Sequence, residues 1–153
     1  DLEGLGGRPL ASLRAVAVFP DGHPLARLQQ VGLAQLAEAD VIALNAEDAS
    51  RQRLDALLLQ AGLGLKIAIE TPYSSTVCHL ALAGHGVGIA NPATAVGLEV
   101  AGVCHRPLAA PVHFACHIIV HGSRPLSEAG KFWATCLRAA LAPLVERYGL
   151  KRG

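Results

Sequence analysis

The sequence predicts an α/β fold, because a strand–helix–strand pattern stands in the middle of the chain. Residues 66–70 alternate around two isoleucines, which is typical of a short strand. Gly84 suits the carboxyl-terminal cap of the helix that follows, Gly86 and Gly88 allow a tight return, and residues 87–90 read as the next strand. The helix itself is predicted by apolar residues at helical spacing: Val77, Leu80, Ala81 and Gly84.

The elements before this unit are expected to alternate as well. Residues 1–12 are rich in glycine and leucine with little periodicity, and they read as a lead-in segment. Residues 15–19 read as a buried strand, which the turn-forming residues 20–24 stop. Residues 33–38 predict one or two helical turns, and residues 41–44 predict a short buried strand.

A further helix is expected after that strand. Asp48 or Ser50 can cap its start, and Gly62 ends it. Its core stripe is expected to consist of Leu54, Leu57, Leu58 and Ala61.

The last third of the chain predicts two strands and a long helix. Residues 92–98 read as a short helix or turn, and residues 103–108 and 114–120 read as strands, the second apolar enough to cross a core. The helix starts near Ser127, and Pro143 is expected to kink or end it. Its apolar side is expected to hold Trp133, Leu137, Ala140, Leu141 and Leu144.

Hydroxyl side chains gather at the start of the central helix, and they have two interpretations. The first is capping, in which a Ser or Thr oxygen accepts from an orphan backbone N–H and needs no ligand. The second is an anion site, in which free N–H groups and the helix dipole receive a carboxylate or phosphate. Capping needs one hydroxyl and four are present, so we favour capping combined with binding of a small anion. The four are Thr71, Ser74, Ser75 and Thr76.

Two strand-to-helix junctions, residues 45–50 and 71–76, are expected at one edge of the sheet. Ligands bind in open α/β sheets at the carboxyl ends of the strands, so this convergence indicates a binding site. For Asn45 and Asp48, ordinary turn chemistry is as good a reading as contact with a ligand. Arg51 and Arg53 begin a helix, where the dipole disfavours positive charge. Such an arginine is usually only solvated, although one could reach an acidic ligand.

Several motifs in the middle of the chain resemble the effector-binding domain of LysR-type transcriptional regulators, closest to the branch that senses lysine precursors and opines. The order and spacing of the motifs carry the resemblance, which runs from about Arg14 to Leu141. The motifs are Phe19 to Ala26, Ile42 to Asn45, Ser50-Arg51, Leu54-Asp55, Glu70-Thr71, Ser75, Val77-Cys78, Ala83-Gly84, Gly86-Val87-Gly88, Asn91-Pro92 and Thr94-Ala95.

The resemblance implies a fold like that of type 2 periplasmic binding proteins, with a small-molecule cleft between two α/β subdomains. Residues 19–114 would form the second subdomain. Residues 1–18 and 115–145 would supply the crossover strands and a remnant of the first subdomain. The Ser/Thr-rich turn that forms the other wall of the cleft in this family has no counterpart before Arg14, and the family's DNA-binding domain is absent from the sequence.

The effector is expected to be a small carboxylate, namely an amino acid or a derivative. This expectation rests on the hydroxyl-rich helix start together with the resemblance. Thr71, Ser74 and Ser75 are expected to contact the acid group. The cleft is expected to be lined by Asn45, Ser50 and Asn91. Self-association, a cytoplasmic location and weaker effector binding than in an intact regulator are also expected, with no cofactor.

Composition limits the remaining possibilities. The chain has 153 residues, enough for one domain with a core, and its formal charge of +1 is not the footprint of a nucleic-acid-binding surface. DNA contact is therefore expected only through the missing domain. No apolar run is long enough to span a membrane, and no secretory signal is visible. The chain contains no Met, even at its start, which together with the resemblance suggests a fragment.

Four cysteines are too few for a disulfide scaffold, and free thiols of a reducing compartment are expected. Three of them precede a histidine: Cys78, Cys104 and Cys116. Adjacent residues on a strand point to opposite faces, so such a pair there cannot chelate zinc with both side chains. No other metal-ligand spacing occurs, and no metal site is expected.

Two other function classes are alternatives to a regulatory domain. A transporter's solute-binding protein would share the fold, but free cysteines and the lack of a secretion signal count against it. A hydrolase would use Ser74 or Ser75 with one of seven histidines, but the sequence has no Gly-x-Ser-x-Gly elbow. No catalytic residue is expected.

Overall fold

The computed structural model describes residues 5–97, 102–121 and 124–149, and the chain divides into two compact units. The central unit comprises residues 14–113. The terminal unit combines the residues up to 13 with those from 114 onward. The two units are described separately below.

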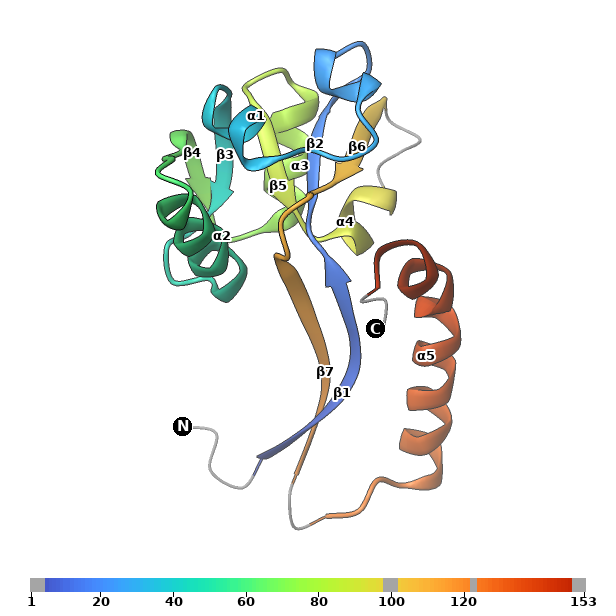
Figure 1. Cartoon of the computed structure of the whole chain (residues 1–153). Helices are drawn as coiled ribbons and strands as arrows, with labels where there is room; N and C mark the ends of the chain where they lie inside the picture. The colour runs from blue at the N-terminus through green and yellow to red at the C-terminus, as the bar shows by residue number, and fades with distance from the viewer. Residues whose placement is uncertain (1–4, 98–101, 122–123, 150–153) are drawn as a thin grey trace. The chain divides into compact units, whose positions relative to one another are not determined.

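The central unit is built on a five-stranded sheet with strand order β4-β3-β5-β2-β6 (Figure 1). Strand β3 runs parallel to β4 and β5, whereas β2 is antiparallel to its neighbours β5 and β6. The carboxyl ends of β3, β4, β5 and β6 therefore meet at one edge of the sheet. The strands are β2 (Val16–Pro20), β3 (Asp40–Leu44), β4 (Lys66–Thr71), β5 (Val87–Ala90) and β6 (Val103–Pro107).

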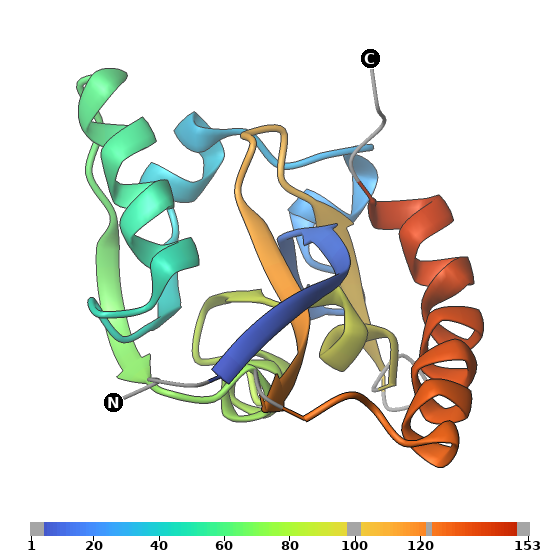
Figure 2. The same cartoon turned by 90° about the horizontal axis from the view of Figure 1, so that it is seen from below.

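Helices connect these strands, as the alternating pattern predicted. Helix α3 packs against β2, β3 and β5 in the middle of the sheet, and Figure 2 shows α2 beside the edge strand β4. The helices are η1 (Pro24–Arg27), α1 (Leu33–Ala37), α2 (Ala49–Gln60), α3 (Ser74–Leu82) and α4 (Pro92–Gly97). Nearly every residue of β2, β3 and β5 is buried, so both faces of the sheet are covered there. Strand β4 is mostly exposed, as its edge position requires.

Two glycines allow the close packing around β5. A Cβ atom on Gly86, whose φ is +145°, would lie 2.5 Å from the backbone oxygen of Asp40. A Cβ atom on Gly88 would lie 2.7 Å from Cγ1 of Val77 in α3. Gly88 therefore allows α3 to lie directly on the sheet, whereas the sequence had indicated only a tight return.

The terminal unit pairs two long strands and carries one long helix. Strand β1 (Leu5–Arg14) pairs with β7 (His113–His121), and α5 spans Glu128–Tyr148. Helix α5 begins just after Ser127, as expected, and Ser127 caps it, because its Oγ accepts from the backbone N–H of Gly130 at 3.1 Å. An isolated bridge joins Leu13 to Gly149 beyond the end of that helix.

Two expectations for the terminal unit were wrong, and the third, that Pro143 kinks or ends the last helix, was wrong as to the ending. The lead-in segment is a strand from Leu5 onward, because pairing with β7 supplies the order that its own pattern lacks. Strand β7 alternates between half-buried and exposed residues rather than crossing a core. Helix α5 continues through Pro143 to Tyr148. Ala139 and Pro143 are exposed, so water can satisfy the carbonyl that the proline leaves unbonded.

The core stripes of the central helices differ in part from the prediction. Leu54 and Leu58 of α2 are buried, but Ala61 is exposed beyond the helix end. In α3 the buried residues are Val77, Cys78 and Ala81, while Leu80 is half-buried and Gly84 is exposed. Because α3 is only nine residues long, the sequence pattern defines its buried face poorly. Leu98 lies outside the described residues.

Candidate functional site

The two strand-to-helix junctions meet at one edge of the central sheet, as expected. Strands β3 and β4 are parallel neighbours, and their last residues, Leu44 and Thr71, are paired in register. Asn45 and the start of α2 follow the first strand, and the start of α3 follows the second. All six candidate residues therefore lie at or just beyond the carboxyl ends of β3, β4 and β5.

The start of α2 is capped by the side-chain carboxylate of its N-cap residue, Asp48. Oδ1 of Asp48 accepts from the backbone N–H groups of Ser50 at 2.8 Å and Arg51 at 3.1 Å. The hydroxyl of Ser50 also donates to Asp48, and Ser50 is buried. The half-buried Asn45 accepts from the N–H of Asp48 at 3.0 Å through its backbone oxygen. Of the two predicted caps, Asp48 is the one used, and it acts by ordinary turn chemistry.

The start of α3 has a different arrangement. Tyr73 occupies the N-cap position and makes no side-chain cap hydrogen bond. Thr71 is buried at the end of β4, Ser74 is half-buried, and Ser75 is exposed on the first turn. The first turn of this helix therefore carries hydroxyl side chains, and its N-cap residue supplies no side-chain cap of the kind seen at α2.

Asn91 brings the end of β5 to the same place. Its backbone N–H donates to Oγ of Ser74 at 3.3 Å, which ties the end of β5 to the first turn of α3. Its side-chain Oδ1 accepts from the N–H of Ala93 at 3.0 Å and so covers the start of α4. Among the described helices that begin at this edge, α2 and α4 are capped by side chains of their own, and α3 is not.

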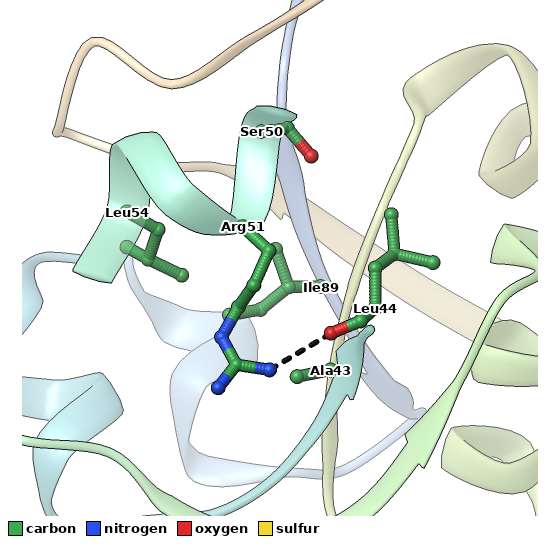
Figure 3. A pocket seen from close by; sticks show the side chains of 6 residues that line it. All are labelled: Ala43, Leu44, Ser50, Arg51, Leu54 and Ile89. Atoms are coloured by element: carbon green, nitrogen blue, oxygen red, sulfur yellow. Dashed lines mark hydrogen bonds between the residues drawn. The ribbon is translucent and has the colours of Figure 1, made fainter. Parts of the chain in front are cut away.

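Arg51 is buried, which contradicts the expectation of a solvated side chain. Its Nε donates to both carboxylate oxygens of Asp55, at 3.0 and 2.9 Å. Its Nη1 donates to the backbone oxygen of Leu44 at 2.8 Å (Figure 3). The same nitrogen also donates to Oε1 of Glu70 at 2.6 Å. Burial alone would lower the pKa of Arg51. Hydrogen bonds and charge attraction from Glu70 and Asp55 outweigh it, and the pKa lies above its ordinary value.

The sequence contained a partial signal for these contacts. Arg51 and Asp55 stand at i and i+4, the spacing of an ion pair on a helix. The contact with Glu70 crosses from α2 to β4 and could be found only from the structure.

A small cavity lies beside Arg51 in the central unit. It is about 10 Å³ in volume, which is room for a single water molecule. It is too small for an effector, so the candidate site is the exposed edge and not this cavity. The cavity is lined by Ala43, Leu44, Ser50, Arg51, Leu54 and Ile89 (Figure 3).

The cysteines are unpaired in the structure, and they differ in burial. Cys78 is buried, and burial raises the pKa of its thiol to about 11. Cys104 and Cys116 are half-buried, and Cys136 is exposed. Within residues 5–97, 102–121 and 124–149, no cluster of His, Cys, Asp and Glu could hold a metal ion.

The histidine nearest the serine cluster along the chain is engaged with the backbone. Nδ1 of His79 lies 2.7 Å from the backbone oxygen of Ser75, one turn earlier in α3. A carbonyl oxygen only accepts, so Nδ1 carries the proton and donates it. This arrangement does not make His79 a base for either serine hydroxyl.

None of the helices in the described part of the chain has the length and apolar character of a membrane-spanning segment.

Comparison with known sequences identifies the family. A family model described as the LysR substrate binding domain matches residues 1–142. The transcriptional activator LysR of Escherichia coli (strain K12) is 32% identical over 136 residues, covering 89% of this chain and 44% of that protein. The regulatory protein NocR of Agrobacterium tumefaciens (strain T37) is 32% identical over 144 residues, covering 93% and 48%. The chain thus spans about half the length of the curated relatives it matches.

Solved structures confirm the fold. HinK, a LysR family transcriptional regulator from Pseudomonas aeruginosa, has a TM-score of 0.68 at 24% identity, covering 90% of this chain and 49% of that one. The effector binding domain of QuiR, in complex with shikimate, has a TM-score of 0.65 at 17% identity, covering 95% and 68%. The type 2 periplasmic-binding-protein-like α/β fold and the resemblance noted in the sequence are both confirmed. The chain belongs to the family of LysR substrate-binding domains, the effector-binding regions of LysR-type transcriptional regulators.

Proposed function

We propose that this chain senses a small carboxylate, an amino acid or a derivative of one, for a LysR-type transcriptional regulator. The observation that carries this proposal is the start of α3. Its N-cap residue provides no side-chain cap, and its first three residues, Ser74, Ser75 and Thr76, all carry hydroxyls. Backbone N–H groups and the dipole at a helix start favour a negative group, and hydroxyls add further donors.

Each candidate residue has a role in this proposal. Thr71, Ser74 and Ser75 contact the acid group, because they lie at the end of β4 and on the first turn of α3. Asn45 and Asn91 line the cleft at the ends of β3 and β5. Ser50 also belongs to this wall, and its hydroxyl, already donated to Asp48, keeps the start of α2 in place.

The neighbouring helices explain why the acid group is assigned to α3. Asp48 already places a carboxylate on the N–H groups of α2, so a second anion there would be repelled. Helix α4 has only six residues, and Asn91 covers its start. The arrangement at α2 also shows, within this fold, the kind of carboxylate contact that we propose for α3.

The regulator is favoured over a transporter's solute-binding protein because the two curated relatives described above are a transcriptional activator and a regulatory protein. For the whole protein, we propose that residues 19–114 form the second subdomain, and that residues 1–18 and 115–145 supply crossover strands and part of the first. We also propose that the regulator acts in the cytoplasm, pairs through its effector-binding domain, and contacts DNA through a separate N-terminal domain.

A thermal-shift screen tests the carboxylate proposal. The 153-residue chain is mixed with amino acids and opines and, in parallel, with the corresponding amides, which keep the shape and lose the negative charge. Acids are expected to raise the melting temperature and amides to leave it unchanged. If only uncharged compounds raise it, the proposal is wrong.

A double variant, S74A with S75A, locates the binding. Each hydroxyl that bonds to a charged group contributes about 1.5–3 kcal/mol, so its loss weakens binding roughly tenfold or more. The matched control is T135A, which removes an exposed hydroxyl of α5 that donates to the backbone oxygen of Lys131. Equal weakening by the control would show that the effect is not specific to α3.

A further inference from the structure

Arg51 joins three elements of the central unit through one buried guanidinium. It stands on the first turn of α2, it donates to the last residue of β3, Leu44, and it donates to Glu70 near the end of β4. The side chain of Arg51 is 9% exposed, whereas those of Asp55 and Glu70 are 44% and 47% exposed. The buried arginine is thus the centre of the cluster, and its acidic partners reach it from the surface.

Each of these positions is next to a candidate site residue in the chain. Arg51 follows Ser50, Leu44 precedes Asn45, and Glu70 precedes Thr71. The guanidinium therefore connects both junctions, residues 45–50 and 71–76, and each of its contacts lies one residue away in the chain from a side chain proposed to form the site.

The same contacts make Arg51 a poor direct ligand. Its Nε is shared by the two oxygens of Asp55, and its Nη1 is shared by Leu44 and Glu70. Its Nη2 makes no hydrogen bond to a described residue, but a carboxylate arriving there would be repelled by the two resident ones, those of Asp55 and Glu70.

We infer that Arg51 is a positioning residue for the effector site, which holds the ends of β3 and β4 and the start of α2 in the arrangement that receives the ligand. This inference rests on the proposed function for the identity of the ligand. It adds that the spacing of the two junctions depends on a group that does not touch the ligand.

Hydrogen–deuterium exchange on the unliganded chain tests the structural part of the inference. R51Q and E70A are each expected to speed amide exchange about tenfold or more in both segments, residues 45–51 and 70–77. The matched control is R106Q. Arg106 also donates to backbone oxygens, those of Leu28, His105 and Ala26, but it lies on β6 at the opposite edge of the sheet. R106Q is expected to leave both segments unchanged.

Binding of acetate, with acetamide as its neutral counterpart, tests the functional part. The shifts of the backbone amide signals of residues 74–77 report the dissociation constant for the molecules that are folded. R51Q and E70A are each expected to weaken acetate binding about tenfold, and R51K is expected to recover part of that loss, because one ammonium can reach some of the three acceptors.

The direction in which E70A changes acetate affinity distinguishes a positioning role from a purely electrostatic effect. Removing Glu70 takes a negative charge away from the site, so electrostatics alone would strengthen acetate binding. Positioning predicts that binding weakens. Because removing a buried charge can unfold a protein, E70A, which removes a half-exposed partner, decides the question if R51Q does not fold.

Three outcomes would overturn the inference. The first is faster exchange in residues 45–51 alone, which would mean that Arg51 does not connect the junctions. The second is a lower melting temperature with unchanged acetate affinity, which would mean that its role is only structural. The third is tighter acetate binding by E70A. If the unaltered chain binds no acetate, the proposed function fails, and the exchange data still decide whether Arg51 holds the two junctions.

Discussion

Substituting Gly88 by alanine tests how closely α3, which carries the proposed site, lies on the sheet. The new methyl group would lie 2.7 Å from Cγ1 of Val77, 3.3 Å from the backbone oxygen of Val77 and 3.3 Å from Cβ of Ala81. Carbon atoms in contact prefer separations of about 3.5–4.0 Å, so α3 or the strand must move by roughly 1 Å. Val77 is fully buried, and a valine in a helix has one preferred rotamer, so its side chain cannot turn away.

Overpacking of this kind costs about 1–3 kcal/mol. For a domain of roughly 100 residues, that lowers the melting temperature by about 4–20 °C. Denaturant and thermal unfolding of G88A measure the loss. The double variant G88A with V77A removes the clashing methyl group of Val77. Its loss of unfolding free energy is therefore expected to be smaller than the sum of the losses in the two single variants.

G64A is the matched control for that experiment. A Cβ atom on Gly64 would meet nothing within 4 Å, and its φ does not lie in the left-handed region. This variant is expected to be neutral or up to about 1 kcal/mol more stable, because alanine restricts the unfolded chain. If G88A is as stable as G64A, the close packing of α3 described here is wrong.

Four further predictions concern the thiols, the last helix and the length of the chain. Burial raises the pKa of Cys78 from 9.0 to about 11, so the folded state holds this proton more tightly than the unfolded state does. This preference contributes about 2–3 kcal/mol of stability, which is complete below about pH 9 and is expected to be lost as the pH rises through 11. C78A is expected to remove this dependence of stability on pH. Titration of the denatured, unreduced chain is expected to give four free thiols, and a value near zero would indicate disulfides instead. Phe132 and Trp133 of α5 are 69% and 66% exposed, so the chain is expected to self-associate in light scattering and W133E to weaken this; a strict monomer at high concentration would contradict it. If the gene encodes a longer regulator with both walls of the cleft, this chain is expected to bind the effector about a hundred- to ten-thousand-fold more weakly than that regulator. The second wall would add two charge-assisted hydrogen bonds, which are together worth about 3–6 kcal/mol. Equal affinities in calorimetry would mean that the site is complete in this chain.

The sequence predicted the elements that have strong local patterns. The strand at residues 66–70 and the helix end at Gly62 were correct, and Asp48 is one of the two caps that the sequence offered for α2. Alternation, capping and left-handed glycine are local properties. Strand β1 was missed because its order comes from pairing with a segment more than a hundred residues away. Pro143 does not end the helix, because exposure, which the sequence does not give, decides whether a helix can continue past a proline.

The position of the candidate site could be predicted from the sequence, but its detailed arrangement could not. The sequence placed both junctions at one sheet edge because parallel strands end together, and the register of Leu44 with Thr71 confirms this. It could not show which helix start is open, since that depends on Asp48 accepting from α2 while Tyr73 leaves α3 without a side-chain cap. The burial of Arg51 was likewise missed, because Glu70 reaches it from another element.

The central claim is that a carboxylate binds at the start of α3. The most direct measurement is a titration of the ¹⁵N-labelled chain with acetate, followed through the backbone amide signals of residues 74–77 and, as an internal reference, those of residues 50–52 in α2. The claim predicts saturable shifts at α3, little change at α2 where Asp48 already occupies the N–H groups, and loss of the shifts in the S74A and S75A double variant. Shifts of equal size with acetamide, or shifts confined to α2, would contradict it.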